Sequence, residues 1–226
     1  MKEIFARQQA LIPPKDQDRL KDSSLLVAGV GGLGCVAAEI LVRSGVGSLY
    51  LLDHKVVDAP DLNRQILYTR DDLGQPKVEA ACKRLKAIRP EVEIFPLKRP
   101  LEAGFVLPPQ IVGVIDALDN WSSRFLLDTL CQERGCFLVH AGLDGFFGQV
   151  TSIIPGKTPR LSEIFAGAKE EKTVPATAFI CFFLGAIQAL EAIKLILDWP
   201  DTLAGRLLIV DLSLYHWEIL PLAKTP

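Results

Sequence analysis

A run of apolar residues that ends in a cluster of glycines constrains this chain more than any other feature. The segment reads Leu25-Leu-Val-Ala-Gly-Val-Gly-Gly-Leu-Gly34, and a stretch of small and apolar residues, Cys35–Val42, follows it. This order predicts a buried strand, a tight turn and a helix, which point backbone N–H groups and the positive end of a helix dipole at an anion. Asp53 ends the next apolar run about 20 residues later, where an acid that hydrogen-bonds a ribose is expected. The sequence therefore predicts a nucleotide site.

Composition favours one packed domain and limits the partners. Of the 226 residues, 49% are hydrophobic, and the formal net charge is −2. A chain of this kind buries a good core and has no dense basic run, so nucleic acid is not expected as a general partner. The five cysteines, an odd number at irregular spacing, indicate reduced thiols. Because the first residues also lack the apolar core of a signal peptide, we expect a cytoplasmic protein.

One uncharged segment, 174–190, approaches the length of a membrane span. A span needs about 20 apolar residues, whereas this segment contains Thr177 and Gln188 and runs into Glu191. We therefore expect a buried helix here and no membrane contact.

Segments with strand and helix patterns alternate through the first part of the chain. The expected strands are 24–30, 48–53, 91–97, 111–116 and 136–140. The expected helices are 3–22, interrupted by Pro13-Pro14, and then 32–44, 76–88 and 120–134. This alternation predicts an α/β fold with a Rossmann-like, doubly wound and mostly parallel sheet.

The pattern changes after Gly142. A strand at 148–154, a polar and mobile crossover loop at 155–175, a helix at 180–197 and strands at 206–211 and 215–220 complete the chain. The late strands predict antiparallel C-terminal edge strands on the sheet. We expect a single domain over 1–226, with a nucleotide-binding core at 23–142 and the crossover loop, buried helix and edge strands at 143–226.

Three polar segments are expected at the carboxyl ends of the strands, where ligands bind in such sheets. They are Asp53 with Asp58–Gln65, Gly74–Lys77, and Asp116–Asn120 followed by Arg124. Lys77 falls in the first turn of a helix, where a cation opposes the helix dipole, so it is expected to meet an anion. Arg64 and Lys77 supply charge for more than a pyrophosphate, and Asp119 suits a magnesium ion that bridges phosphates. The set favours a nucleoside triphosphate over a dinucleotide.

Each of these residues also has a purely structural interpretation. Arg64 could form a surface ion pair, and Lys77 could be a solvated helix residue. Asp119 with Asn120 could cap the following helix. Three such coincidences explain the pattern less well than one site does.

The same motifs resemble the MoeB/ThiF/HesA family of ubiquitin-activating-type adenylating enzymes over residues 5–220. The matching pieces, in order, are Gly29–Gly34, Leu51-Leu-Asp53, Leu62-Asn-Arg-Gln65, Gly74-Gln-Pro-Lys77, Asp116–Asn120 with Arg124, and Gly185–Lys194. The resemblance implies an adenylyltransferase that uses ATP and Mg²⁺ to adenylate the C-terminal glycine of a small ubiquitin-fold sulfur-carrier protein ending in Gly-Gly. It also implies a homodimer. The carrier carboxylate would attack the α-phosphorus in line and pyrophosphate would leave, so positioning and charge neutralisation carry catalysis.

The resemblance also assigns roles to individual residues. The expected catalytic residues are Arg64 and Lys77 on the phosphates, Asp119 on magnesium, and Arg7, which reaches the phosphates of the partner subunit. Arg124 is expected to brace the site. The nucleotide is expected to contact Gly29, Gly31, Gly32, Asp53 (at the ribose), Asp61, Asn63, Arg64, Lys77, Asp119 and Asn120.

The sequence departs from many relatives in its cysteines. The Cys-x-x-Cys pairs that hold zinc occur neither in the crossover nor near the C-terminus, and Cys131 and Cys136 have the wrong spacing. The crossover also lacks the catalytic cysteine of some relatives, and Cys181 lies in an apolar run typical of a core. We therefore expect a zinc-free enzyme without covalent cysteine chemistry. Lys55 and Asp61 stand where the family commonly has an acid and an asparagine.

Three alternatives remain open at this point. A tRNA-modification dehydratase of the same superfamily is disfavoured by the lack of a basic patch, and an NAD-dependent dehydrogenase gives Arg64 and Lys77 no task. A catalytically silent nucleotide-binding relative remains because of Lys55 and Asp61. The sequence does not identify the carrier, nor whether its pathway makes thiamine, molybdopterin, cysteine or another sulfur compound.

Overall fold

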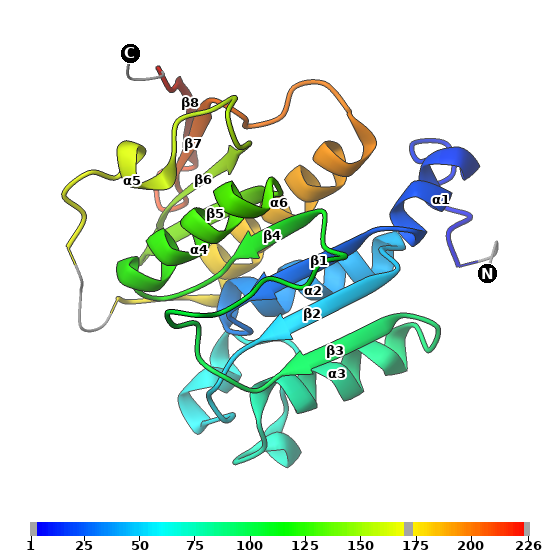
Figure 1. The fold of residues 1–226 in the computed structure, drawn as a ribbon. Helices are drawn as coiled ribbons and strands as arrows, with labels where there is room; N and C mark the ends of the chain where they lie inside the picture. Colours follow the sequence, from blue (N-terminus) through cyan, green and yellow to red (C-terminus); the bar gives the residue numbers. More distant parts are fainter. Residues whose placement is uncertain (1–3, 170–173, 224–226) are drawn as a thin grey trace.

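Eight strands form one mixed sheet in a computed structural model that describes residues 4–169 and 174–223. The order across the sheet is β3-β2-β1-β4-β5-β6-β7-β8 (Figure 1). Strands β1 to β5 run parallel, and β6, β7 and β8 are antiparallel to their neighbours. The predicted α/β sheet with an antiparallel C-terminal edge is therefore confirmed. The strands are β1 Ser24–Ala28, β2 Ser48–Leu52, β3 Glu93–Leu97, β4 Gly113–Asp116, β5 Phe137–Asp144, β6 Phe147–Ile153, β7 Arg206–Asp211 and β8 His216–Pro221.

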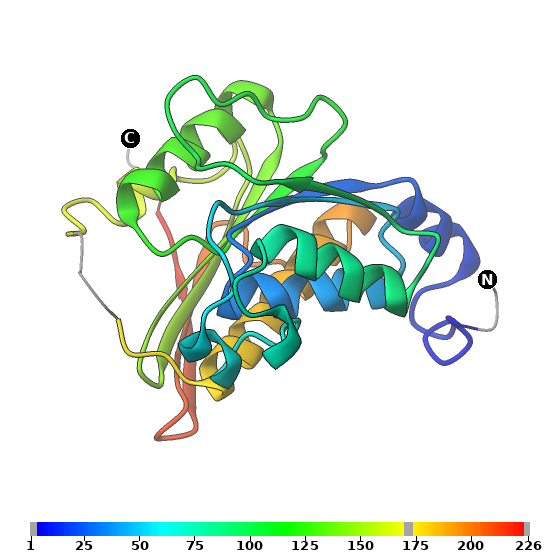
Figure 2. The same ribbon diagram turned by 90° about the horizontal axis from the view of Figure 1, so that it is seen from below.

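The helices cover the two faces of the sheet unequally. Figure 2 shows α2 (Gly32–Ser44), α3 (Lys77–Ile88) and α6 (Ala178–Leu197) on one face and α4 (Trp121–Arg134) on the other. The short α5 (Leu161–Ile164) packs beside α4. Because side chains of a strand alternate between faces, successive residues of β1 enter two different cores. Leu25 and Val27 join the core under α2, whereas Leu26 and Ala28 join the core under α4.

Glycines set the turn before α2 and both of its ends. Gly29 has a φ of +88°, and a Cβ atom there would lie 2.4 Å from the carbonyl oxygen of Ala117. Gly31 precedes the helix, and Gly45 ends it with a φ of +107°. A side chain at Gly34 would lie 1.9 Å from the carbonyl oxygen of Gly29. These constraints explain why the predicted bounds of this helix, 32–44, are confirmed.

Helix α6 packs against α2 and the sheet, as expected for a core helix. It buries Cys181, Leu184 and Gln188, among others. By length and composition α6 is also long and apolar enough to cross a membrane, and 56% of its 18-residue apolar stretch is buried inside the protein. Its remaining face leaves Phe179, at 70% exposure, and Leu190, at 41%, in contact with solvent.

Two expectations about the N-terminal segment and α3 were wrong. The first helix, α1, covers only Pro14–Lys21, and turns occupy residues 4–11. Proline suits the first turn of a helix but disfavours helical geometry in the residue before it, so Pro13-Pro14 marks a start rather than an interruption. In the same way Pro76 precedes α3, which begins at Lys77.

The crossover after β6 is more ordered than its composition suggested. Residues 161–164 form α5, and the backbone N–H of Leu161 donates to the buried carboxylate of Asp128 at 3.2 Å. Arg160 lies 3.5 Å from the same carboxylate. This part of the predicted mobile loop is therefore tied to α4. Residues 170–173 of the predicted loop, and 224–226 of the tail, lie outside the described residues.

Candidate nucleotide-binding site

The predicted polar segments meet at one edge of the sheet because β2, β1 and β4 are neighbours. Each of the three strands ends at this edge, and the loops after them are joined by backbone hydrogen bonds. The N–H of Gly29 donates to the carbonyl of Leu52 at 2.8 Å, and the N–H of Ala117 donates to that of Ala28 at 2.9 Å. The glycine turn and the N-terminus of α2 therefore lie between the loops after β2 and β4.

Asp53, the predicted ribose acid, organises the loops on either side of it. One carboxylate oxygen accepts the N–H of Val30 in the glycine turn at 2.9 Å, and the other accepts the N–H of Lys55 at 2.8 Å. Its backbone lies directly after β2. The side chain thus stands next to the glycine turn, where the sequence predicted it.

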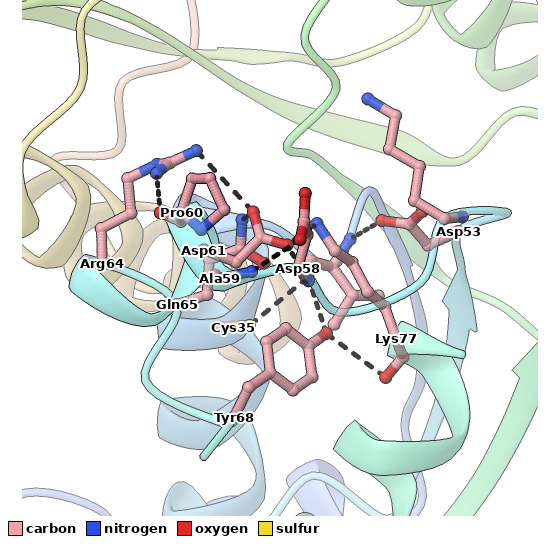
Figure 3. Close-up of polar contacts among 12 residues, drawn as sticks. Cys35, Asp53, Asp58, Ala59, Pro60, Asp61, Arg64, Gln65, Tyr68 and Lys77 are labelled. Atoms are coloured by element: carbon pink, nitrogen blue, oxygen red, sulfur yellow. Dashed lines mark hydrogen bonds and ion pairs between the residues drawn. The ribbon is translucent and has the colours of Figure 1, made fainter. Parts of the chain in front are cut away.

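Asp61 is the centre of a buried charged cluster (Figure 3). Its Oδ2 lies 3.0 Å from Nζ of Lys77 and accepts the N–H of Asp58 at 3.1 Å. Its Oδ1 accepts Nε2 of Gln65 at 2.5 Å and lies 3.9 Å from the guanidinium of Arg64. Lys77 is only 5% exposed, so it is not a solvated helix residue. Part of its charge is balanced by Asp61, a pairing that the sequence did not reveal.

Arg64 reaches toward the start of α2. Its guanidinium donates to the carbonyl of Pro60 at 2.8 Å and to Oδ1 of Asn63 at 3.0 Å. A Cβ atom added to Gly32 would lie 3.7 Å from Cγ of Arg64. The structure therefore places Arg64 beside Gly32, and Asn63 accepts a hydrogen bond from its guanidinium.

Asp119, the predicted magnesium ligand, forms an ion pair with Lys55. Nζ of Lys55 lies 2.6 Å from Oδ2 of Asp119. Burial alone would raise the pKa of Asp119, but the hydrogen bond and charge of Lys55 hold that pKa below its usual range. The capping role belongs to the next residue, since Oδ1 of Asn120 accepts the N–H of Ser123 at 2.8 Å. The carboxylate of Asp119 therefore does not cap the helix.

Arg124 braces the loop that carries Asp119, as expected. Its guanidinium donates to the carbonyl of Leu118 through Nη2 at 2.7 Å and lies over the ring of Trp121. Both contacts are local to the start of α4.

Sequence reasoning missed the buried support beneath the glycine turn. The hydroxyl of Tyr68 donates to the carbonyl of Val30 at 2.8 Å, and the thiol of Cys35 donates to the same oxygen at 3.4 Å. On the other side, Nε2 of Gln188 donates to the carbonyl of Asp116 at 2.7 Å and to that of Val139 at 3.1 Å. Tyr68 gives no signal of this kind in the sequence, whereas Gln188 lies in the matching segment Gly185–Lys194, where no role was assigned to it.

Arg7 does not join the site within one chain. Its segment lies at the far end of α2, where the side chain of Gln8 donates to the carbonyl of Ser44 at 3.0 Å. A 13-residue helix is about 20 Å long, and the site lies at the other end of α2. Arg7 itself is exposed.

A magnesium ion at this edge of the sheet would have to share its coordination between Asp119 and the phosphates of a ligand. Among the side chains of residues 4–169 and 174–223, no group of three or more His, Cys, Asp or Glu could hold a metal ion. Magnesium is commonly held by one or two carboxylates together with substrate phosphates. Asp119 fits that arrangement, in which the protein supplies one carboxylate rather than a complete set of ligands.

Comparison with known proteins agrees with this geometry. The ThiF family model matches residues 5–226. The SAMP-activating enzyme E1 of Haloferax volcanii is 36% identical, covering 95% of this chain and 82% of the relative. The sulfur carrier protein adenylyltransferase of Thermus thermophilus is 32% identical, covering 98% and 88%. Among solved structures, E. coli MccB with ATP has a TM-score of 0.86 at 19% identity, covering 99% of this chain and 72% of MccB. With its glycine turn, its fold and these relatives, the chain belongs to the ThiF family.

Proposed function

We propose that this protein is an ATP-dependent adenylyltransferase. The observation that carries the proposal is that Arg64 and Lys77 meet at the carboxylate of Asp61, while Arg64 also lies against Gly32 at the N-terminus of α2. A helix N-terminus presents backbone N–H groups to an anion. A dinucleotide site needs no such pair of cations. The names of two relatives, a SAMP-activating enzyme E1 and a sulfur carrier protein adenylyltransferase, support the same reaction class.

In this proposal each residue performs a physical task. Asp53 binds the ribose hydroxyls, and Arg64 and Lys77 hold the phosphates with the N-terminus of α2. Asp119 holds magnesium, which when bound neutralises phosphate charge. Catalysis rests on preorganised charge and on holding the α-phosphate in line with its attacker. Little covalent chemistry is asked of the side chains.

The acceptor we propose is the C-terminal carboxylate of a small ubiquitin-fold sulfur-carrier protein that ends in Gly-Gly. The carboxylate oxygen attacks the α-phosphorus, the bond to the bridging oxygen breaks, and pyrophosphate leaves with that electron pair. The products are the carrier acyl-adenylate and pyrophosphate. No step requires a cysteine, because the carrier carboxylate is itself the nucleophile, and four of the five thiols are buried.

We also propose that the protein acts as a homodimer. Arg7 lies about 20 Å from the site along α2 of its own chain, so it can serve a site only on a second chain. The exposed apolar residues of α6, Phe179, Phe182 and Leu190, supply a surface of the kind that oligomers bury.

Pyrophosphate exchange tests the proposal. The protein with a panel of Gly-Gly carriers should incorporate labelled pyrophosphate into ATP, and Asp119→Ala should remove this activity without unfolding the chain. ATP with magnesium should raise the melting temperature, whereas NAD should not. Stronger stabilisation by NAD would favour a dehydrogenase. Nucleotide binding without exchange for any carrier would favour the silent relative or the tRNA-modification dehydratase.

A further inference from the structure

The ion pair of Lys55 and Asp119 spans the nucleotide site. Lys55 follows β2, Asp119 follows β4, and 64 residues separate them in the sequence. Since β1 lies between these strands, the 2.6 Å contact bridges the loops on either side of the glycine turn. The two side chains are 48% and 70% exposed, so a ligand at this edge of the sheet can reach both.

The backbone of Lys55 is fixed to the rest of the site. Its N–H donates to Asp53 at 2.8 Å, and its carbonyl accepts the N–H of Lys77 at 3.0 Å. The ammonium of Lys55 is paired with the carboxylate of Asp119 at 2.6 Å. Lys55 is therefore placed by the same backbone frame that places Lys77.

Resting on the proposed function, we propose that Lys55 is a built-in counter-cation that lets the site bind ATP with little help from magnesium. Without a metal, the carboxylate of Asp119 would repel the nucleotide phosphates. Lys55 neutralises that carboxylate and places an ammonium beside the phosphates. With a metal present, magnesium and Lys55 compete for Asp119, so the metal adds less affinity than it would at an unpaired carboxylate.

Charges at this edge support the assignment. The ammonium of Lys55 lies 2.6 Å from Oδ2 of Asp119, and its backbone N–H donates to the carboxylate of Asp53 at 2.8 Å. The ammonium of Lys77 is already paired with Asp61 at 3.0 Å. An acid in place of Lys55 would remove one positive charge and add one negative charge where the tetra-anionic nucleotide must sit.

The test measures binding rather than turnover. The analogue AMPCPP, which has a methylene between the α- and β-phosphorus, is titrated calorimetrically into the full chain with excess EDTA and again with saturating magnesium. The quantity of interest is the dissociation constant without magnesium divided by the dissociation constant with magnesium. In the wild type we expect this ratio to be below about tenfold, and in Lys55→Asp we expect it to rise by about tenfold or more through loss of metal-free binding. Lys55→Met should fall between them.

A matched control is Lys86→Asp, the same charge change at an exposed position of α3. Lys86 lies about 13 Å along the helix from Lys77, farther than the Debye length of about 8 Å at 0.15 M salt. Its ratio should equal that of the wild type. Thermal unfolding of all four proteins checks that the variants are folded.

The outcomes separate this inference from the proposed function. An unchanged ratio in Lys55→Asp, or tighter metal-free binding in Lys55→Met, overturns the role of Lys55 while leaving ATP binding intact. Failure of the wild type to bind AMPCPP with or without magnesium overturns the proposed function, and this inference with it.

Discussion

Gly32 and Cys181 are packed so closely that no side chain fits between them. A Cβ atom on Gly32 would lie 2.6 Å from Sγ of Cys181 and 3.3 Å from its Cβ. Gly32 is the first residue of α2, and Cys181 lies in the first turns of α6. The glycine is therefore needed for helix packing as well as for approach to a nucleotide.

This contact predicts a rescue within one chain. Gly32→Ala should lower both the melting temperature and the affinity for ATP, because the new methyl group meets the thiol and shifts the start of α2. Adding Cys181→Ala removes Sγ and should recover most of the stability. The Cys181→Ala single variant, expected to cost about 1 kcal/mol, is the control. Recovery of stability without recovery of ATP binding would show that the methyl group also blocks the ligand.

Local signals in the sequence were sufficient for much of the fold. The bounds of α2 follow from Gly31 and Gly45, and β7 matches its predicted range because a continuous apolar run defines it. The extra length predicted for the first helix arose because a polar pattern continues across Pro13-Pro14. Glycine therefore marked the ends of α2, whereas the predicted first helix and α3 began too early because their prolines were placed inside the helix.

The sequence did not reveal which charged side chains of the site pair with one another. Lys55 meets Asp119 only because β2 and β4 flank β1, and Asp61 meets Lys77 only because the loop after β2 folds back on α3. The residues of the motif were predicted, but which cation neutralises which acid is decided by strand order. The pair of Asp116 and His140 likewise follows from the register of β4 and β5, which sets the two residues side by side.

Arg64 and Lys77 should differ in what their loss does to stability. Each change to alanine should lower pyrophosphate exchange by about a hundredfold or more, by analogy with the loss of one preorganised charge-stabilising group. Lys77→Ala should also cost roughly 3 kcal/mol of unfolding free energy, because it leaves the buried Asp61 short of its partner. Arg64→Ala should cost much less, since Arg64 is 3.9 Å from Asp61. Chemical denaturation of both variants measures the difference.

A double variant separates stability from catalysis at Lys77. Lys77→Met with Asp61→Asn removes both charges and should regain stability relative to Lys77→Ala, while exchange stays low. Recovered exchange in this variant would mean that Lys77 acts only by holding Asp61.

The buried His140 predicts a pH dependence of stability. Its Nδ1 lies 2.7 Å from Oδ2 of Asp116, and neither side chain reaches solvent. Burial lowers the pKa of His140 below its ordinary value, despite the opposing effect of Asp116. The unfolded chain therefore takes up a proton near pH 6.5 that the folded protein does not, and stability is lost as the pH falls from 7 toward the lowered pKa. The loss reaches at most about 1.4 kcal/mol per pH unit.

Comparison with His140→Gln isolates this contribution. The variant changes no ionisable group except His140, so subtracting its free energy of unfolding at pH 5, 6 and 7, measured by urea denaturation, isolates the His140–Asp116 pair. The wild type should lose more stability than the variant over this range. Equal slopes would show that His140 does not titrate differently in the two states.

The thiols of Cys35 and Cys181 are expected to be inert. Burial raises the pKa of Cys181 to about 11 and that of Cys35 to about 12, so both are protonated at neutral pH and should react slowly with iodoacetamide. Replacing all five cysteines with alanine should spare pyrophosphate exchange, at about 1 kcal/mol of stability for each buried position. A carrier thioester detected by mass spectrometry on any cysteine, above all Cys181, would contradict this.

The position of Arg7 leads to the last prediction. If the N-terminal segment serves the neighbouring chain, a dimer of one Arg7→Ala chain and one Lys77→Ala chain contains one intact site, formed by Lys77 of the first chain and Arg7 of the second. Mixing the two inactive proteins under exchange conditions should therefore restore pyrophosphate exchange. Mixing Arg7→Ala with Arg64→Ala should do the same, because Arg64 belongs to the same site as Lys77. The pair Lys77→Ala and Arg64→Ala is the matched control and should stay inactive, since both changes fall on the same side of the dimer interface and every site lacks one cation. If the first two mixtures stay inactive although their chains are folded and have swapped subunits, Arg7 does not act across the interface.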